Sequence, residues 1–337
     1  MGAVTVRSGR VWRRARVALV AAAALALAGC GGATVGGSSG GGSGGSGGGS
    51  GPACGTVNLA VNPWVGYEAD AAVYAYVAKT KLNCNVVKKD LKEQVSWEGF
   101  GTGQVDVILE NWGHDDLTKQ YITEQKTATD LGQTGNKGII GWYVPPWLAQ
   151  AHPDITDWKN LNKYADQFKT SESGGQGQLL DGDPSYVTND AALVKNLNLN
   201  FKVVQGGSET ALIQSFRQAE AQHQFFLAYF YEPQWFFQEL KLVRVNLPAY
   251  TPGCDADAAK VACDYPPYNL NKIASSKFMS SGNPAAELAK KFGWTNDDQN
   301  AVARSIAVDK LSDDDAAKKW VDANPDKVKA WLPAGTS

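Results

Sequence analysis

The chain has 337 residues, with 32 Lys or Arg against 34 Asp or Glu. Five of the arginines lie within the first 16 residues, so the remainder has 27 basic and 34 acidic residues and a net charge near −7. This balance excludes a nucleic-acid-binding surface of the usual basic kind, and the length from about residue 54 is enough for two lobes.

The N-terminus has the pattern of a secretory signal. A stretch with five arginines precedes an apolar run from Val17 to Ala28, which is too short to span a bilayer as a mature helix. The run ends in Leu27-Ala28-Gly29-Cys30, which resembles a bacterial lipobox. We therefore expect residues 1–29 to be a lipoprotein signal peptide, with acyl chains on Cys30 anchoring the protein to the cell membrane outside the cytoplasm. An ordinary secretory signal with a chance cysteine is the alternative.

Residues 30–53 combine the lipidated cysteine with a segment made almost wholly of Gly and Ser. Such a segment has no side chains to bury, so it is expected to act as a flexible tether. Gly41 to Gly45 match the G-x-S-x-G pattern of hydrolases, but no strand precedes them and no helix follows, so the match indicates only low complexity.

Four further cysteines, Cys54, Cys84, Cys254 and Cys263, follow the tether in a compartment where disulfides persist. We expect Cys54–Cys84 and Cys254–Cys263 because each pair is near in sequence, although spacing alone leaves three pairings open. Reduced or metal-binding pairs are the alternative, but the sequence has no C-x-x-C and no Cys/His cluster with zinc spacing, so no metal site is expected.

From Thr56 onward, short β-branched runs alternate with helical patterns, which indicates α/β architecture. Strands are predicted at Thr56–Val61, Asn85–Val87, Val105–Leu109, Ile139–Val144, Lys202–Val204, Phe225–Tyr231 and Leu242–Leu247, the last before a loop rich in Pro, Asp and Cys. Helices are predicted over about residues 68–81 and 210–221, and again in the tail from Pro284, with start signals at Asn296, Ser312 and Asn324-Pro325.

Aromatic side chains recur where the predicted strands end. Ligands of open α/β sheets bind beyond the carboxyl ends of the strands, so these side chains are expected to converge on one cleft. They are Trp64 and Tyr67 after the first strand, Trp112 after the strand ending at Leu109, Tyr186 before a predicted helix, and Tyr231 at the end of a later strand.

Several ring faces can enclose a cation that has no hydrogen-bond donors, and each contact is worth about 0.5 to 2 kcal/mol. Three or four rings would supply much of the roughly 8 kcal/mol of a micromolar complex. Taken singly, each ring is more often a packing residue, which is how we interpret Trp97, Trp147, Trp158, Trp294, Trp320 and Trp331.

The order of these features resembles that of the glycine betaine, proline betaine and choline binding proteins of ABC importers. The features are, in chain order, the signal, Cys30, the tether, the strand with Trp64, the strand with Asn111-Trp112-Gly113-His114, Tyr231-Glu232-Pro233 and the helical tail. The resemblance covers roughly Thr56 to Leu332. It implies a two-lobed fold of the periplasmic-binding-protein type II, with the ligand in a cleft between lobe I (residues 54–141 and 248–337) and lobe II (residues 142–247). It also implies a membrane permease as partner and an extracytoplasmic, monomeric protein.

In this family an aromatic box holds a trimethylammonium group. By this resemblance Trp112 matches the family's Asn-Trp step, Tyr231 the aromatic residue before Glu-Pro, and Trp64 the tryptophan of the first loop in choline-type members. Tyr186 stands where betaine-type members have Trp, which is a departure that keeps an aromatic ring.

Three further residues are candidates for the same pocket. Glu110 would repel a betaine carboxylate and favour choline if it faced the ligand; the alternative is that it points away along its strand. His114 is a candidate partner for a ligand carboxylate, and Trp142 is either a wall of the box or hinge packing.

Other functions lack their motifs. An exported hydrolase would need a nucleophile with a base, and apart from the pattern in the tether the sequence has no such motif, so neither catalysis nor a cofactor is expected. A ligand-sensing protein for a membrane receptor would share the fold and pocket, and the sequence leaves this alternative open.

Overall fold

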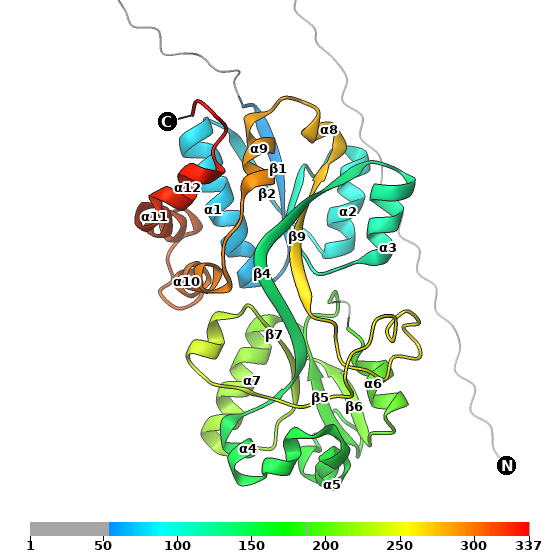
Figure 1. Cartoon of the computed structure of the whole chain (residues 1–337). Helices are drawn as coiled ribbons and strands as arrows, with labels where there is room; N and C mark the ends of the chain where they lie inside the picture. Colours follow the sequence, from blue (N-terminus) through cyan, green and yellow to red (C-terminus); the bar gives the residue numbers. More distant parts are fainter. Residues whose placement is uncertain (1–53, 187, 337) are drawn as a thin grey trace, which may run out of the picture. The chain divides into compact units, whose positions relative to one another are not determined.

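A computed structural model describes residues 54–186 and 188–336 (Figure 1). The predicted signal peptide, Cys30 and the tether lie outside these residues. The fold is α/β, as expected, and its described part divides into two lobes that share one nine-stranded sheet. No helix among the described residues is long and apolar enough to cross a membrane.

The first lobe combines the N-terminal part of the described chain with its C-terminal tail. Its strands are β1 (Thr56–Val61), β2 (Asn85–Asp90), β3 (Val107–Asn111), the first part of β4 (Ala128–Val144) and β9 (Tyr268–Ser275). Its helices are α1 (Val65–Leu82), α2 (Glu93–Thr102), α3 (Asp115–Leu117), α8 (Ser276–Met279), α9 (Pro284–Lys291), α10 (Asn296–Ala307), α11 (Asp313–Ala323) and α12 (Pro325–Trp331).

The second lobe is built from the middle of the chain. Its strands are the end of β4, β5 (Gly177–Asp181), β6 (Phe201–Gln205), β7 (Ala228–Glu232) and β8 (Val243–Arg244). Its helices are α4 (Pro146–Ala151), α5 (Leu161–Tyr164), α6 (Asp190–Asn196) and α7 (Glu209–Gln222). The lobe boundaries predicted at residues 141 and 247 stay a prediction.

Strand β4 passes from one lobe into the other, as the long green strand in Figure 1 shows. Up to Gly138 it pairs with β9, and from Ile139 onward it pairs with β7, both antiparallel. The strand order is therefore β2-β1-β3-β9-β4-β7-β5-β6, with parallel strands in each outer half.

The chain returns to the first lobe through the segment between β8 and β9, and Arg244 fastens this segment to β4. Its Nη2 donates to the carbonyl of Ile140 at 2.7 Å and lies 2.9 Å from Oδ1 of Asp264. Gly141 makes room for this contact, because a Cβ there would lie 2.5 Å from Arg244 Nε. The two segments that link the lobes within the described chain are thus joined to each other.

The structure corrects two of the predicted strands. β4 begins at Ala128, eleven residues before the predicted start at Ile139. The segment Leu242–Leu247 contains only the two-residue strand β8 and is not the last strand, because β9 follows at Tyr268–Ser275. Both missed stretches are rich in polar residues or glycine, and they form strands because they pair with each other.

The helical tail follows its predicted start signals. Helix α10 begins at Asn296 after a capping box of Thr295 and Asp298, and the Ser312 side chain caps α11. Trp320 and Trp331 are buried and stack with ring centroids 5.6 Å apart, which confirms that they pack the tail helices. The chain also forms the expected disulfides Cys54–Cys84 and Cys254–Cys263.

Candidate functional site

Six aromatic side chains meet where the lobes face each other. The first lobe contributes two tryptophans, the second contributes three tyrosines, and one tyrosine comes from the start of β9. We call this group the aromatic cluster: Trp64, Trp112, Tyr186, Tyr229, Tyr231 and Tyr268.

The rings contact one another continuously from lobe to lobe. Ring centroids are 5.8 Å apart for Trp64 and Tyr186, 6.3 Å for Tyr186 and Tyr231, and 5.8 Å for Tyr231 and Trp112. All three pairs meet edge to face. Four of the five aromatic residues that the sequence predicted at strand and loop ends are therefore brought together in this series.

Local backbone features place these rings. Trp64 has an extended backbone at the residue before α1, and Trp112 directly follows β3. Gly138 of β4 makes room for Trp112, because a Cβ there would lie 2.6 Å from its Cζ3. Gly182 does the same for Tyr186, whose Cδ2 would lie 2.5 Å from the added Cβ.

Glu110 lies behind the two tryptophans and is only 2% exposed. Its Oε1 accepts from Nε1 of Trp64 and from Nε1 of Trp112, each at 2.8 Å. Its Oε2 accepts from Nε2 of Gln299 at 2.6 Å. Of the two arrangements that the sequence left open, the structure therefore has the carboxylate directed at its neighbours within the first lobe.

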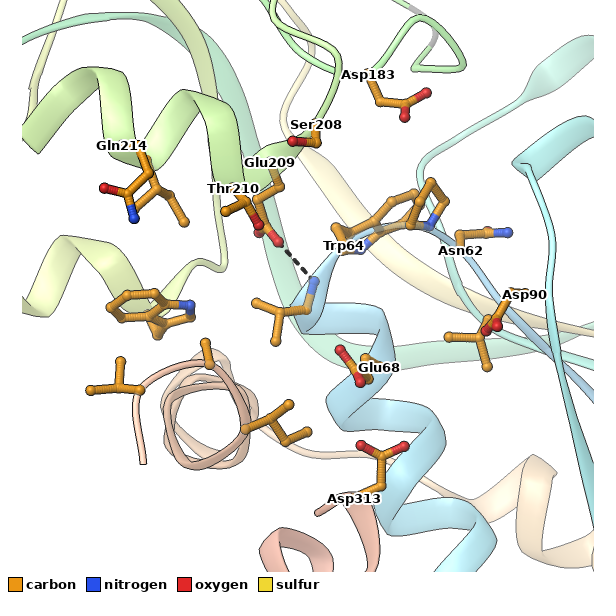
Figure 2. A pocket seen from close by; sticks show the side chains of 18 of the residues that line it. Asn62, Trp64, Glu68, Asp90, Asp183, Ser208, Glu209, Thr210, Gln214 and Asp313 are labelled. Atoms are coloured by element: carbon orange, nitrogen blue, oxygen red, sulfur yellow. Dashed lines mark hydrogen bonds between the residues drawn. The ribbon is translucent and has the colours of Figure 1, made fainter. Parts of the chain in front are cut away.

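Glu209, the first residue of α7, links the two lobes (Figure 2). Its Oε2 accepts from the backbone N–H of Val65 at 2.9 Å, at the start of α1 in the first lobe. Its Oε1 accepts from the Tyr231 hydroxyl at 2.8 Å and from the amide of Gln234. Burial raises the pKa of Glu209 to about 7, although the bonds from Val65 and Tyr231 oppose the rise.

Asp190 occupies a comparable position inside the second lobe. Its Oδ1 accepts from Nε1 of Trp142 and from the Tyr265 hydroxyl, both at 2.7 Å. Burial, followed by the charge of Asp181, raises the pKa of Asp190 to about 7. Trp142 is fully buried on β4, where it pairs with Tyr229 of β7, and its role as a wall of the box or as hinge packing stays a prediction.

Of two other predicted residues, Tyr67 contacts a ring of the cluster and His114 pairs with an acid. Tyr67 is fully buried on α1, where its hydroxyl accepts from the Leu109 N–H at 3.1 Å and its ring meets Trp64 edge to face. His114 pairs through Nε2 with Oε1 of Glu93 at 3.1 Å. Burial alone would lower the pKa of His114, but the bond to Glu93 and the charges of Glu93, Asp116 and Asp115 together outweigh it, and the pKa is raised.

A groove of about 960 Å³ borders the aromatic cluster on one side (Figure 2). It runs between the start of α1 and the start of α7, and it reaches Trp64 and Glu209. Its other polar side chains are of both charges and include Glu68 and Asp313, which face each other in Figure 2. Burial and the charge of Asp313 raise the pKa of Glu68 to about 7.

Several residues of this site were missed from the sequence. Tyr229 had a usable signal, because it alternates with Tyr231 on β7 and so shares its face. Tyr268 lies on a strand that was not predicted. Glu209 and Gln299 had no local signal, because their partners lie 144 and 189 residues away.

Comparison with known proteins places this arrangement in a family. The family model described as the substrate binding domain of an ABC-type glycine betaine transport system matches residues 55–323. The trimethylamine N-oxide-binding protein of Pelagibacter ubique (strain HTCC1062) is 26% identical over 262 residues, which cover 74% of this chain and 81% of that protein.

Solved structures share the fold. Lactococcal OpuAC, in its closed-liganded conformation complexed with glycine betaine, aligns with a TM-score of 0.65 at 21% identity, covering 82% of this chain and 99% of that one. An ABC-transporter choline binding protein in complex with choline aligns with a TM-score of 0.67 at 18% identity, covering 82% and 91%. The chain belongs to the family of substrate-binding domains of ABC-type glycine betaine transport systems.

Proposed function

We propose that this protein captures a small quaternary-ammonium compound in the aromatic cluster and delivers it to an ABC permease. The observation that carries the proposal is the continuous series of rings from Trp64 through Tyr186 and Tyr231 to Trp112, which joins both lobes. A ligand held by rings from both lobes would stabilise the closed arrangement of the lobes.

The rings suit a cation without hydrogen-bond donors. Such a cation loses little on leaving water compared with a compact ammonium, and each ring face attracts it by about 0.5 to 2 kcal/mol. A cage of four rings supplies much of the roughly 8 kcal/mol that corresponds to micromolar affinity.

Charges around the cluster favour a ligand with net positive charge, such as choline. Glu110 accepts hydrogen bonds from Trp64 and Trp112, Glu209 accepts one from Tyr231, and both acids are buried. His114, the candidate partner for a betaine carboxylate, is engaged by Glu93. Negative charge beside the rings attracts a cation and repels the carboxylate of a zwitterion.

Calorimetry tests the proposal. The mature protein is titrated with choline, glycine betaine, proline betaine, carnitine and trimethylamine N-oxide, and with 3,3-dimethyl-1-butanol, the uncharged analogue of choline. We expect choline to bind most tightly and the uncharged analogue to bind far more weakly, since it lacks the cation–π attraction. Equal binding of choline and its analogue, or no binding of any cation, would contradict the proposal.

We also propose that Cys30 anchors the protein at the membrane. The support is the lipobox-like Leu27 to Cys30 followed by the Gly/Ser tether. The protein should sediment with membranes in the producing cell, and Cys30→Ala should release it. A Cys30→Ala variant that stays in the membrane fraction would show that something else holds it there.

A further inference from the structure

Two cage tryptophans from separate elements share one hydrogen-bond acceptor. Trp64 precedes α1 and Trp112 follows β3, yet both indole N–H groups donate to the same oxygen, Oε1 of Glu110, at 2.8 Å. The carboxylate therefore fixes the relative position of two rings that no covalent proximity would hold together.

Glu110 is itself held in place. Gln299 on α10 donates to Oε2 at 2.6 Å, and the carbonyl of Gln299 accepts from Nδ2 of Asn136 on β4 at 2.6 Å. The exposed fractions are 2%, 0% and 1% for Glu110, Gln299 and Asn136. This buried chain of three side chains ties the two indoles to the frame of the first lobe.

Gly66 leaves the room that this series of hydrogen-bonded side chains needs. A Cβ at position 66 would lie 2.6 Å from Nε2 of Gln299, the atom that donates to Glu110. Gly66 lies in the first turn of α1, where alanine would favour the helix by roughly 1 kcal/mol. The close approach of the Gln299 amide therefore explains why this position is a glycine.

A second acid lies behind the first. Asp70 on α1 is fully buried, and neither of its oxygens has a hydrogen-bond donor among the described residues. Burial and then the charge of Glu110 raise the pKa of Asp70 well above its ordinary value.

We propose that Glu110 is a positioning residue for Trp64 and Trp112, which we call the tryptophan wall. By accepting both indole N–H groups, Glu110 sets the geometry in which the two rings meet a quaternary ammonium, without touching the ligand itself. The proposal rests on the proposed function for its ligand, but the hydrogen bonds join protein atoms alone. It differs from a direct contact of Glu110 with the cation, which would make the carboxylate charge at position 110 indispensable.

The first test is the pair of variants Glu110→Gln and Glu110→Gln/Gln299→Glu. In the single variant the new amide NH₂ at position 110 faces the NH₂ of Gln299. Two donors then oppose each other, which displaces the carbonyl oxygen at position 110 that accepts from the two indoles. In the double variant the acid and amide exchange places: the carbonyl at 110 accepts both indoles, its NH₂ donates to the carboxylate at 299, and that carboxylate accepts from Asn136.

Calorimetry with tetramethylammonium chloride, which has neither hydroxyl nor carboxylate, reports the cage alone. We expect Glu110→Gln to bind roughly tenfold more weakly, as when one ring contact is lost, and the double variant to return close to the parent. Glu110→Gln binding as tightly as the parent, or a double variant as weak as the single one, would overturn the proposal.

The second test needs no ligand and so separates this inference from the proposed function. In protein with ¹⁵N-labelled tryptophan, the indole signals of Trp64 and Trp112 are assigned from Trp64→Phe and Trp112→Phe. Glu110→Gln should shift both signals, and the double variant should restore them. The matched control is Asp190→Asn, which should shift the Trp142 signal and leave these two unchanged. A Glu110→Gln spectrum in which only one signal or neither moves would disprove a shared acceptor.

Discussion

The two lobes hold their cage rings in different ways. In the first lobe, Trp64 and Trp112 are fixed by Glu110, which is fixed in turn by residues of the same lobe. In the second lobe, Tyr231 is fixed by Glu209, whose other oxygen bonds to Val65 across the cleft. The hydroxyl of Tyr186 also crosses, donating to the Pro63 carbonyl at 3.1 Å.

This difference implies that the rings of the two lobes act at different stages of binding. The bonds of the tryptophan wall do not depend on how the lobes are placed, so this wall is formed before the ligand arrives. The rings of the second lobe, Tyr186 and Tyr231, form the tyrosine wall. The bonds that link this wall to the first lobe, from Tyr186 to Pro63 and from Val65 to Glu209, form only when the lobes meet. A ligand would bind first to the tryptophans and then be enclosed by the tyrosines.

The largest effect should come from removing a ring. Trp112→Ala should lose about 1 to 2 kcal/mol of cation–π attraction together with shielding from water, which is roughly tenfold or more in affinity. Tyr231→Ala should lose less, because tryptophan is the better ring, and Trp112→Phe should lose less than Trp112→Ala. Calorimetry with the best ligand measures all three, with Trp158→Phe outside the cluster as control. Unchanged affinity in both alanine variants would refute the cage.

Removing the bond between the lobes should speed release. Glu209→Ala leaves the Val65 N–H, the Tyr231 hydroxyl and the Gln234 amide without their acceptor. Unsatisfied buried donors cost about 1 to 3 kcal/mol, so we expect the dissociation rate to rise roughly tenfold while association changes little. Stopped-flow fluorescence measures both rates. A slower association with unchanged dissociation would mean that the contact forms before closure.

Affinity should depend on pH through the same residue. Burial raises the pKa of Glu209 to about 7 from an ordinary 4.5, and closing the lobes completes this burial because Val65 of the first lobe then covers Oε2, so we expect closure to take up a proton between these values. The favourable contribution is fully present below pH 4.5 and is lost as pH rises through 7, by at most about tenfold per pH unit. Calorimetry at pH 6 and 8.5, in buffers of different ionisation enthalpy, measures the uptake. Glu209→Gln should abolish it; uptake that persists would assign it to another acid.

The smallest effect should come from Tyr186→Phe. It keeps the ring and removes only the hydroxyl that bonds to the Pro63 carbonyl. A neutral hydrogen bond contributes about 0.5 to 1.5 kcal/mol when buried, and this one is exposed, so we expect a loss of about threefold at most. Calorimetry beside Tyr186→Ala checks it, since the alanine variant should lose clearly more. Equal losses in the two variants would mean that the hydroxyl and not the ring is what matters.

Much of the fold could be predicted because its signals are local. The tail helices were found from Asn296, Ser312 and Asn324-Pro325, each beside the helix that it starts, although the cap of α10 is Thr295. The beginning of β4 and the whole of β9 could not be found. Their sequences alternate poorly and contain glycine and polar residues, and they are strands because each pairs with the other across more than a hundred residues.

The same distinction holds for the site. Trp64, Trp112 and Tyr231 were predicted because each follows or ends a strand, and sheet topology brings such positions together. The direction of Glu110 could not be predicted, because it is decided by Trp64 and Gln299, which are far away in sequence. Sequence patterns located these three rings and named Glu110 as a candidate, but they did not give the direction of Glu110 and they missed Glu209.

The joint between the lobes gives the release of ligand a definite form. Only β4 and the returning segment connect the lobes in the described chain, and Arg244 fastens one to the other through Ile140 and Asp264. Two fastened segments allow rotation about one axis and resist sliding. We therefore expect opening to carry Trp112 and Tyr231 apart along a single arc, so that a ligand held between them would lose both walls together instead of ring by ring.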